Sequence, residues 1–351
     1  MKKFFLNPKN NFFPFLTNSK GEMMITKITH AHELTLDNKT TELSTHNCLG
    51  IFLNARISVS NSDAKDATVN IEDVLNKIKF NVRKNNTTSL IEIDAFTLAL
   101  FNIFDANSYF NVDANVKIPK ESQQNIIVPL YVDGPFRAED YYDFDISMTV
   151  NQKVSDVVSI SDIAVEVTGV YTDEKINDPI VERTKKVFKK GFVSGSYQEV
   201  VRLNTTNAVQ QGIIIFRDKN GVRTDNIKKI GLRVVENTST DILMESYASA
   251  KMICKLQYNP KIMPRGVLFL DFRHEVTGDY YGIKMWRLNK DEKLFFAVES
   301  DIEGTIEVAT KELVVTPELL DKSNEEIIIT PTSPEIDSNP DYYSLDFMNM
   351  G

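Results

Sequence analysis

Apolar and polar residues alternate with a period of two over much of this chain. The alternation is unbroken in Leu53–Ser60 and returns in Phe144–Val150. Successive side chains of a β-strand point to opposite faces, so this pattern predicts strands in half-buried sheets. Asp218–Gly221 contains Asn-Gly, which tolerates positive φ angles and therefore predicts a hairpin turn. Further period-two segments occur at Ile163–Val167, Ile230–Val234, Ala250–Tyr258 and Ile302–Val308.

The pattern occurs twice, and five positions of the two copies match at a single offset of 152 residues. A strand and a polar turn lead into a more helical stretch, which is Leu90–Phe104 in the first copy and Ile242–Lys255 in the second. Each copy then reaches an apolar strand that ends in Asp, at Val128–Asp133 and at Val267–Asp271. This ordered succession predicts two tandem β-sandwiches or barrels, although a single large sandwich without duplication also fits the alternation. The matched positions are Ile78, Phe80, Val82, Asn85 and Leu90 with Ile230, Leu232, Val234, Asn237 and Ile242.

The length of the chain and the weak alternation at its ends suggest how it is divided. With 351 residues, of which 42% are apolar, the chain can form two cores. Residues 1–45 show little alternation and residues 316–351 lack core periodicity, so both ends are predicted to be extended arms that order against a neighbour. The predicted division is an arm at 1–45, a first domain at 46–172, a connector rich in charge and turn formers at 173–196, a second domain at 197–315 and an arm at 316–351.

This layout resembles the double jelly-roll major capsid proteins of the adenovirus, tectivirus and corticovirus lineage over about residues 45–315. Gly212–Asp218, Thr224–Ile227 and Met263–Phe272 are similar to second-barrel strands in coat proteins of small membrane-containing icosahedral bacteriophages, such as the lipid-containing phage that infects Flavobacterium. The resemblance implies an all-β fold of two tandem eight-stranded jelly rolls, at 46–172 and 197–315, flanked by extended arms.

The resemblance also implies a structural function. Two jelly rolls per chain give six per homotrimer, so a trimer presents a pseudo-hexagonal outline that tiles an icosahedral shell through large apolar interfaces. The expected partners are further copies of the chain, minor capsid and vertex proteins, and an internal lipid membrane. The expected location is the virion capsid after synthesis in the host cytoplasm. The two cysteines, Cys48 and Cys254, are too few for a disulfide framework, which agrees with a reducing compartment.

The N-terminal arm combines aromatic bulk with positive charge, a mixture suited to the headgroup layer of a membrane. Alternatively, its phenylalanines pack under the chain's own barrel or against a neighbouring subunit. Trp286 is a second candidate contact residue, which either anchors a subunit interface or belongs to the second face of its sheet. The arm residues concerned are Lys2, Lys3, Phe4, Phe5, Phe12, Phe13 and Phe15.

No motif in the sequence predicts catalysis, so we expect no enzyme, no catalytic or cofactor-binding residues and no metal ligands. His30 and His32 lack an acidic or thiolate partner at a useful spacing, and a calcium ion between Asp271 and Asp301 has no further support. Asp143 and Asp145 fit a solvated strand face better than a glycosidase pair. The net charge of −9 argues against a specific nucleic-acid site.

The sequence also fits two other functions. A carbohydrate-binding or carbohydrate-cleaving protein of two sandwiches would use exposed aromatic platforms for sugar stacking. A phage receptor-binding or tail protein would also be a trimer. The tyrosines that would serve sugar stacking are Tyr141, Tyr142, Tyr280 and Tyr281.

Overall fold

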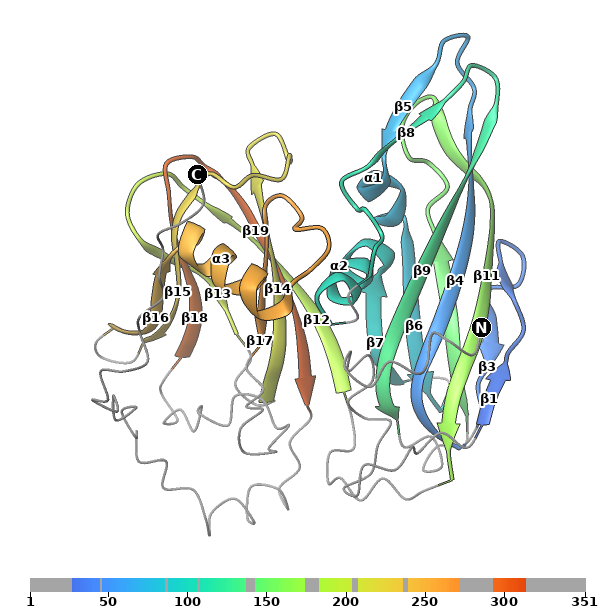
Figure 1. Ribbon diagram of the computed structural model, residues 1–351, viewed down its shortest axis with the longest axis horizontal. Helices are drawn as coiled ribbons and strands as arrows, with labels where there is room; N and C mark the ends of the chain where they lie inside the picture. The colour runs from blue at the N-terminus through green and yellow to red at the C-terminus, as the bar shows by residue number, and fades with distance from the viewer. Residues whose placement is uncertain are drawn as a thin grey trace, which may run out of the picture. The chain divides into compact units, whose positions relative to one another are not determined.

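The computed structural model describes residues 27–44, 46–85, 88–105, 108–136, 143–173, 183–203, 208–235, 239–271 and 293–313. All of them belong to one structural unit that spans Met1–Val315. Strands arranged in antiparallel sheets dominate this part of the chain, and three helices accompany them (Figure 1).

The first half forms two four-stranded sheets, with the strand orders β1-β11-β4-β9 and β7-β6-β10-β3. Strand β2 continues the edge that β1 forms along β11, and β5 pairs with β8 in a separate ribbon. Helix α1 (Ile71–Leu75) precedes β6, and helix α2 (Ala95–Asp105) follows β7. The strands are β1 (Lys27–His30), β2 (Leu34–Thr35), β3 (Thr40–Glu42), β4 (Asn47–Asn61), β5 (Ala67–Asn70), β6 (Ile78–Lys84), β7 (Thr88–Asp94), β8 (Asn115–Ile118), β9 (Gln123–Phe136), β10 (Phe144–Val150) and β11 (Val158–Thr172).

The second half also forms two four-stranded sheets, with the orders β12-β19-β14-β17 and β13-β18-β15-β16. Helix α3 (Tyr247–Tyr258) lies between β16 and β17 in the chain. The strands are β12 (Arg183–Phe192), β13 (Gln198–Arg202), β14 (Ala208–Asp218), β15 (Ile227–Val235), β16 (Ser239–Ser246), β17 (Val267–Asp271), β18 (Lys293–Ser300) and β19 (Gly304–Leu313).

The two halves have the same topology, strand for strand. In chain order, β1, β3, β4, β6, β7, β9, β10 and β11 take the same places in their sheets as β12 to β19 take in theirs. In both halves the long helix follows the fifth of these strands, and α3 begins 152 residues after α2. Two packed four-stranded antiparallel sheets with this order form a jelly roll. The predicted duplication and the predicted all-β fold of two jelly rolls are therefore confirmed.

Some of the boundaries predicted from the sequence differ from those in the structure. Strands β1 to β3 lie within the predicted arm at 1–45, and β12 lies within the predicted connector at 173–196. Strands β1 and β3 lie at sheet edges, where a strand needs little regular alternation, whereas β12 lies between β19 and β7. The predicted strand at Ala250–Tyr258 is wrong, because this segment forms the end of α3. Its buried residues, Tyr247 and Cys254, are seven apart and mark a helical stripe.

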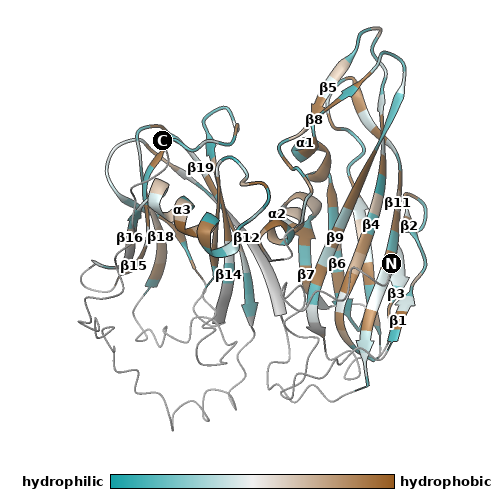
Figure 2. Ribbon diagram, viewed as in Figure 1, coloured by the Kyte–Doolittle hydropathy of each residue, from teal (hydrophilic) through white to brown (hydrophobic). Residues whose placement is uncertain are grey.

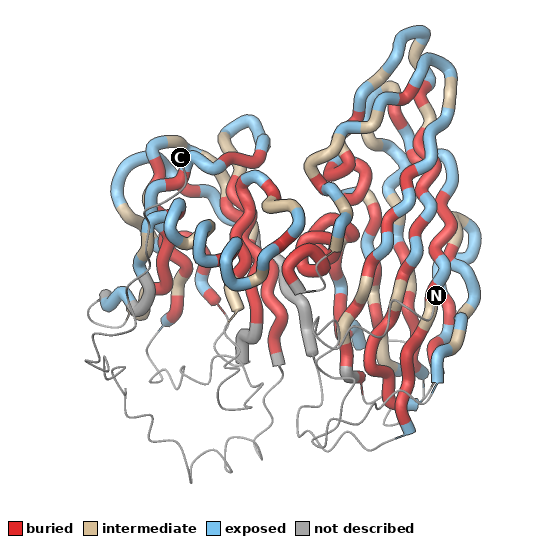
Figure 3. The backbone as a smooth tube through the Cα atoms, in the orientation of Figure 1, coloured by how far each residue is buried: buried red, intermediate tan, exposed pale blue. Residues whose placement is uncertain are grey.

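The hydrophobic core passes through both halves, and α2 lies within it. Every residue of Ala95–Phe104 is buried, which is expected of a helix that is apolar on nearly all sides (Figures 2 and 3). Its two buried polar side chains are satisfied: Thr97 bonds to Asp94, and Asn102 bonds to the main chain of Tyr131. The helix therefore fills the interior without leaving polar groups unpaired.

Candidate functional site

The two jelly rolls meet along a junction that begins in the main chain. Strand β12 of the second jelly roll runs parallel to β7 of the first, and Lys185 pairs with Ile91. This pairing joins two four-stranded sheets into one continuous eight-stranded path. The junction is thus built into the sheet framework and then reinforced by side chains.

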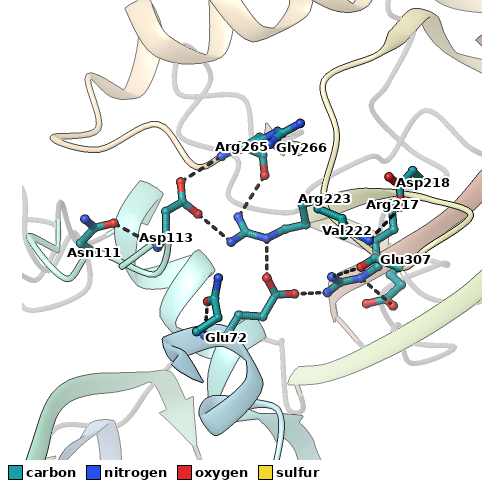
Figure 4. Close-up of polar contacts among 12 residues, drawn as sticks. Glu72, Asn111, Asp113, Arg217, Asp218, Val222, Arg223, Arg265, Gly266 and Glu307 are labelled. Carbon is teal, nitrogen blue, oxygen red and sulfur yellow. Dashed lines mark hydrogen bonds and ion pairs between the residues drawn. The ribbon is translucent and has the colours of Figure 1, made fainter. Parts of the chain in front are cut away.

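A buried ion cluster crosses the junction from α1 (Figure 4). The side chain of Asn70 caps this helix by accepting a hydrogen bond from the main-chain N–H of Glu72. The Glu72 carboxylate accepts a hydrogen bond from Nε of Arg223 at 2.6 Å and forms an ion pair with Nη2 of Arg217. Both arginines belong to the second jelly roll, so one carboxylate of the first half holds two cations of the second.

The remaining donors of Arg223 are used as well. Its Nη2 lies 2.6 Å from Oδ1 of Asp113, and its Nη1 donates to the main-chain oxygen of Arg265 at 3.0 Å. Its guanidinium lies over the ring of Phe96 at 5.2 Å from the ring centre. A planar fork of donors suits arginine to such a multiple contact, and lysine could not replace it.

The second arginine of the cluster, Arg217, turns toward its own jelly roll. Its Nε lies 3.3 Å from Oε1 of Glu307, and its Nη1 donates to the main-chain oxygen of Gly221 at 3.1 Å. With Glu72 and Asp113, the cluster holds three carboxylates around two guanidinium groups. Because Arg223 is only 6% exposed, loss of a partner would leave a buried charge uncompensated.

Aromatic rings form the apolar part of the junction. Phe104 of α2 stacks on Phe269 of β17 with ring centres 4.9 Å apart, and Phe101 meets Phe269 edge-on at 6.4 Å. Lys311 of β19 reaches across to Asp133 at 3.0 Å and lies 4.9 Å from the ring centre of Phe101. Helix α2 therefore packs between the first and the second jelly roll of the same chain.

Most contact residues predicted from the sequence lie outside the described residues. This applies to Lys2, Lys3, Phe4, Phe5, Phe12, Phe13, Phe15 and Trp286, and also to Tyr141, Tyr142, Tyr280 and Tyr281.

The other polar candidates bind different partners. Asp271 accepts from Gln211, whereas Asp301 pairs with Lys228. Within the described ranges, no group of three His, Cys, Asp or Glu side chains is arranged to hold a metal ion. Asp145 is buried and lies 2.9 Å from Nη2 of Arg83, so the prediction of a solvated face is wrong for this residue.

The sequence did not predict the junction. Glu72 and Arg223 are 151 residues apart, and neither belongs to a recognisable motif. The one available signal is Asn70 before an apolar turn, which predicts the start of a helix but not what its acidic residue contacts.

Comparison with known proteins shows which fold this is. No protein-family model matches the sequence, and no curated protein resembles it in sequence. Among solved structures, the crystal structure of the STIV MCP has a TM-score of 0.66 at 15% identity, over 86% of this chain and 100% of that one. The chain has the double jelly-roll fold of major capsid proteins. The atomic structure of Sulfolobus Turreted Icosahedral Virus agrees, with a TM-score of 0.62 at 15% identity over 82% of this chain and 91% of that one.

A more distant structure has the same fold. The PBCV-1 VP54 structure, fitted into a reconstruction of the virophage Sputnik, has a TM-score of 0.51 at 10% identity. The match covers 82% of this chain and 92% of that one. At these identities the double jelly-roll likeness is one of fold.

Within the described residues, no helix is long and apolar enough to cross a membrane.

Proposed function

We propose that this chain is a major capsid protein that self-assembles as homotrimers into an icosahedral viral shell. The observation that carries the proposal is the pair of jelly rolls with one topology, joined by a sheet pairing and a buried ion cluster. A chain built this way presents two equivalent units at a fixed spacing. Three such chains form a ring of six units, which tiles a closed shell.

The chemistry of the junction supports a structural role rather than an enzymatic one. The buried charged side chains at the centre, Glu72, Arg217 and Arg223, bind one another across the two halves. Such a cluster fixes the relative position of two domains, because Glu72 and Arg223 find their charged partners only when both halves are in place. A shell subunit needs this rigidity to transmit its geometry to the lattice.

The proposed partners are further copies of the chain, the minor capsid and vertex proteins of the same virion, and an internal membrane. We assign the membrane contact to the N-terminal arm, because Lys2, Lys3, Phe4 and Phe5 combine cationic and aromatic side chains. Flotation with anionic lipid vesicles tests this assignment. The intact protein should float with the vesicles and a variant without residues 2–20 should not; equal flotation of both would contradict the membrane contact.

The capsid function is tested by mass and by microscopy. Light scattering of the purified full-length chain should give three times the mass of one chain, and negative-stain images should show pseudo-hexagonal particles. A monomer retained on a glycan column would favour the carbohydrate-binding alternative. A trimer found only on fibres of the source particle would favour a receptor-binding protein.

A further inference from the structure

Helix α3 is the counterpart of α2, but the two helices differ in what covers them. All of Ala95–Phe104 in α2 is buried, whereas Tyr247 and Cys254 are the buried residues of α3. Large apolar side chains of α3 are exposed, since Leu256 is 73% exposed and Met252 is 60% exposed. Most of this helix is coloured as exposed in Figure 3. A cluster of exposed apolar side chains on one helix marks an interaction surface.

Both helices are seated on their own jelly roll in the same way. Asn102 of α2 hydrogen-bonds the main chain of Tyr131 in the edge strand β9. Cys254, 152 residues later, hydrogen-bonds the main chain of Phe269 in the edge strand β17. Tyr131 and Phe269 each stand two residues before an Asp in equivalent strands. The outward sides of α2 and α3 are therefore equivalent, and the difference in exposure comes from the neighbour.

The neighbour of α2 is the second jelly roll of the same chain. Phe104 stacks on Phe269, and Phe101 contacts the same ring edge-on. The residues 152 positions after Phe101 and Phe104 are Ile253 and Leu256, which are 46% and 73% exposed. The positions that α2 uses to reach a second jelly roll are thus apolar and uncovered in α3.

We propose that α3 of one chain packs on the first jelly roll of a second copy, as α2 packs on the second jelly roll within the chain. This inference rests on the proposed capsid function and names the contact that joins its copies. We assign a second copy of the chain as the partner of α3, because the equivalent helix α2 already packs against a jelly roll within the chain. The exposed residues of the helical surface are Met252, Ile253 and Leu256.

The strand register identifies the receiving surface on the first jelly roll. In the second jelly roll Phe269 pairs with Ile213 of β14, and in the first Tyr131 pairs with Phe52 of β4. Phe52 and Tyr131 are both partly buried, and their ring centres are 4.9 Å apart. Leu256 of one copy therefore meets the Phe52–Tyr131 aromatic pair of the next.

This contact is heterologous, since it joins two different surfaces of identical chains. Heterologous contacts repeat head to tail and close into a ring when the rotation allows it. Junctions within chains and junctions between chains would then alternate around a trimer. The ring needs no further contact type to bring six jelly rolls together.

The junction between chains should contain less charge than the junction within the chain. Arg217 and Arg223 lie at and just after the end of β14, where the chain turns directly into β15, whereas β5 and α1 are inserted between β4 and β6. Lys311 faces Gln211 in the β14–β19 register, and Val170 takes the matching place in the β4–β11 register. The contact between copies is therefore mainly apolar and should respond weakly to salt.

A charge placed on α3 tests the proposal. We expect Leu256→Asp to raise the concentration at which half of the full-length protein dissociates by roughly thirtyfold or more, as for loss of an interface hot spot. Val193→Asp is the matched control, because Val193 is 62% exposed and lies outside α3. Sedimentation and circular dichroism of both variants would show that each remains folded.

The outcomes separate this inference from the proposed function. If wild type and Val193→Asp form trimers and Leu256→Asp is a folded monomer, the contact is supported. If all three form equally stable trimers, α3 is not the contact, and the capsid function stands. If the wild type is a monomer at every concentration and salt, both are overturned.

A cross-linking experiment tests the partner surface directly. Leu256→Cys and Phe52→Cys variants are co-expressed and treated with a short bismaleimide. A covalent dimer that forms only when both variants are present supports the proposed pairing. A dimer of Leu256→Cys with itself would indicate a symmetric contact and overturn it. No dimer in trimers of the mixed variants would overturn it as well. The wild type is the control, since Cys48 and Cys254 are buried.

Discussion

Asn102 binds the main chain of Tyr131 with both atoms of its side-chain amide, donating to the oxygen at 2.8 Å and accepting from the N–H at 2.7 Å. Strand β9 is the last strand of its sheet, so an amide group takes the place of a neighbouring strand. The bond also fixes α2, whose opposite side contacts the second jelly roll. One side chain therefore links the edge of the first sheet to the junction.

We expect Asn102→Ala to lower the free energy of unfolding by about 2–4 kcal/mol, because it leaves a buried donor and a buried acceptor of Tyr131 without partners. Urea unfolding followed by fluorescence would measure the change. Asn54→Ala is the control, since Asn54 is exposed and bonds to the side chain of Glu166, and its effect should stay within about 0.5 kcal/mol. Equal effects of the two substitutions would show that the edge bond is unimportant.

The ion cluster gives a second expectation. Arg223→Met should lower the free energy of unfolding by about 3–5 kcal/mol, because it removes one of the two cations that compensate the buried Glu72 and also the arginine partner of Asp113. Lys153→Met removes an exposed pair with Asp156 and should cost less than about 1 kcal/mol. Chemical denaturation at pH 7 compares the two. A loss for Arg223→Met as small as that for Lys153→Met would argue against a cluster that fixes the junction.

The sequence predicts those features of the fold that depend on local pattern. The alternating residues Ile78, Phe80 and Val82 lie in β6, and their counterparts 152 residues later lie in β15, because a strand buried on one face needs regular alternation. Strand β1 was missed because an edge strand buries less of its surface, and β12 was missed because Arg183–Phe192 contains five charged residues and little alternation. The cluster of Glu72 and Arg223 could not be predicted, because it exists only once two distant segments have been brought together by folding.

Asp225 gives an expectation for pH. Burial alone would raise the pKa of its carboxyl, but hydrogen bonds from Lys251, Tyr247 and Gly266 lower this pKa by more than burial raises it. The pKa of Asp225 therefore lies below its ordinary value. A pKa that is lower in the folded protein stabilises the fold above the unfolded pKa, and this contribution is lost as the pH falls through the folded value. These hydrogen bonds also hold the start of α3, so acid should loosen the helix.

We therefore expect the melting temperature of Asp225→Asn to lie below that of the wild type at pH 7 and to approach it as the pH falls from about 5 to 3. Thermal unfolding at several pH values measures the difference. Asp37→Asn, at an exposed position, is the control and should follow the wild type throughout. A difference between Asp225→Asn and wild type that is independent of pH would contradict the assignment.

The two thiols should be unreactive until the protein unfolds. Burial raises the pKa of Cys48 to about 12 and that of Cys254 to about 11, so the thiolate fraction at pH 8 is very small in the folded protein. We expect the native protein to react slowly with Ellman's reagent and to release two equivalents at the ordinary rate in denaturing urea. Val193→Cys, at a position that is 62% exposed, should add one fast equivalent. Cys254 holds α3 against β17, so fast labelling of this thiol in the native protein would mean that α3 detaches from its jelly roll. The surface proposed to join neighbouring copies would then not be held in a fixed position.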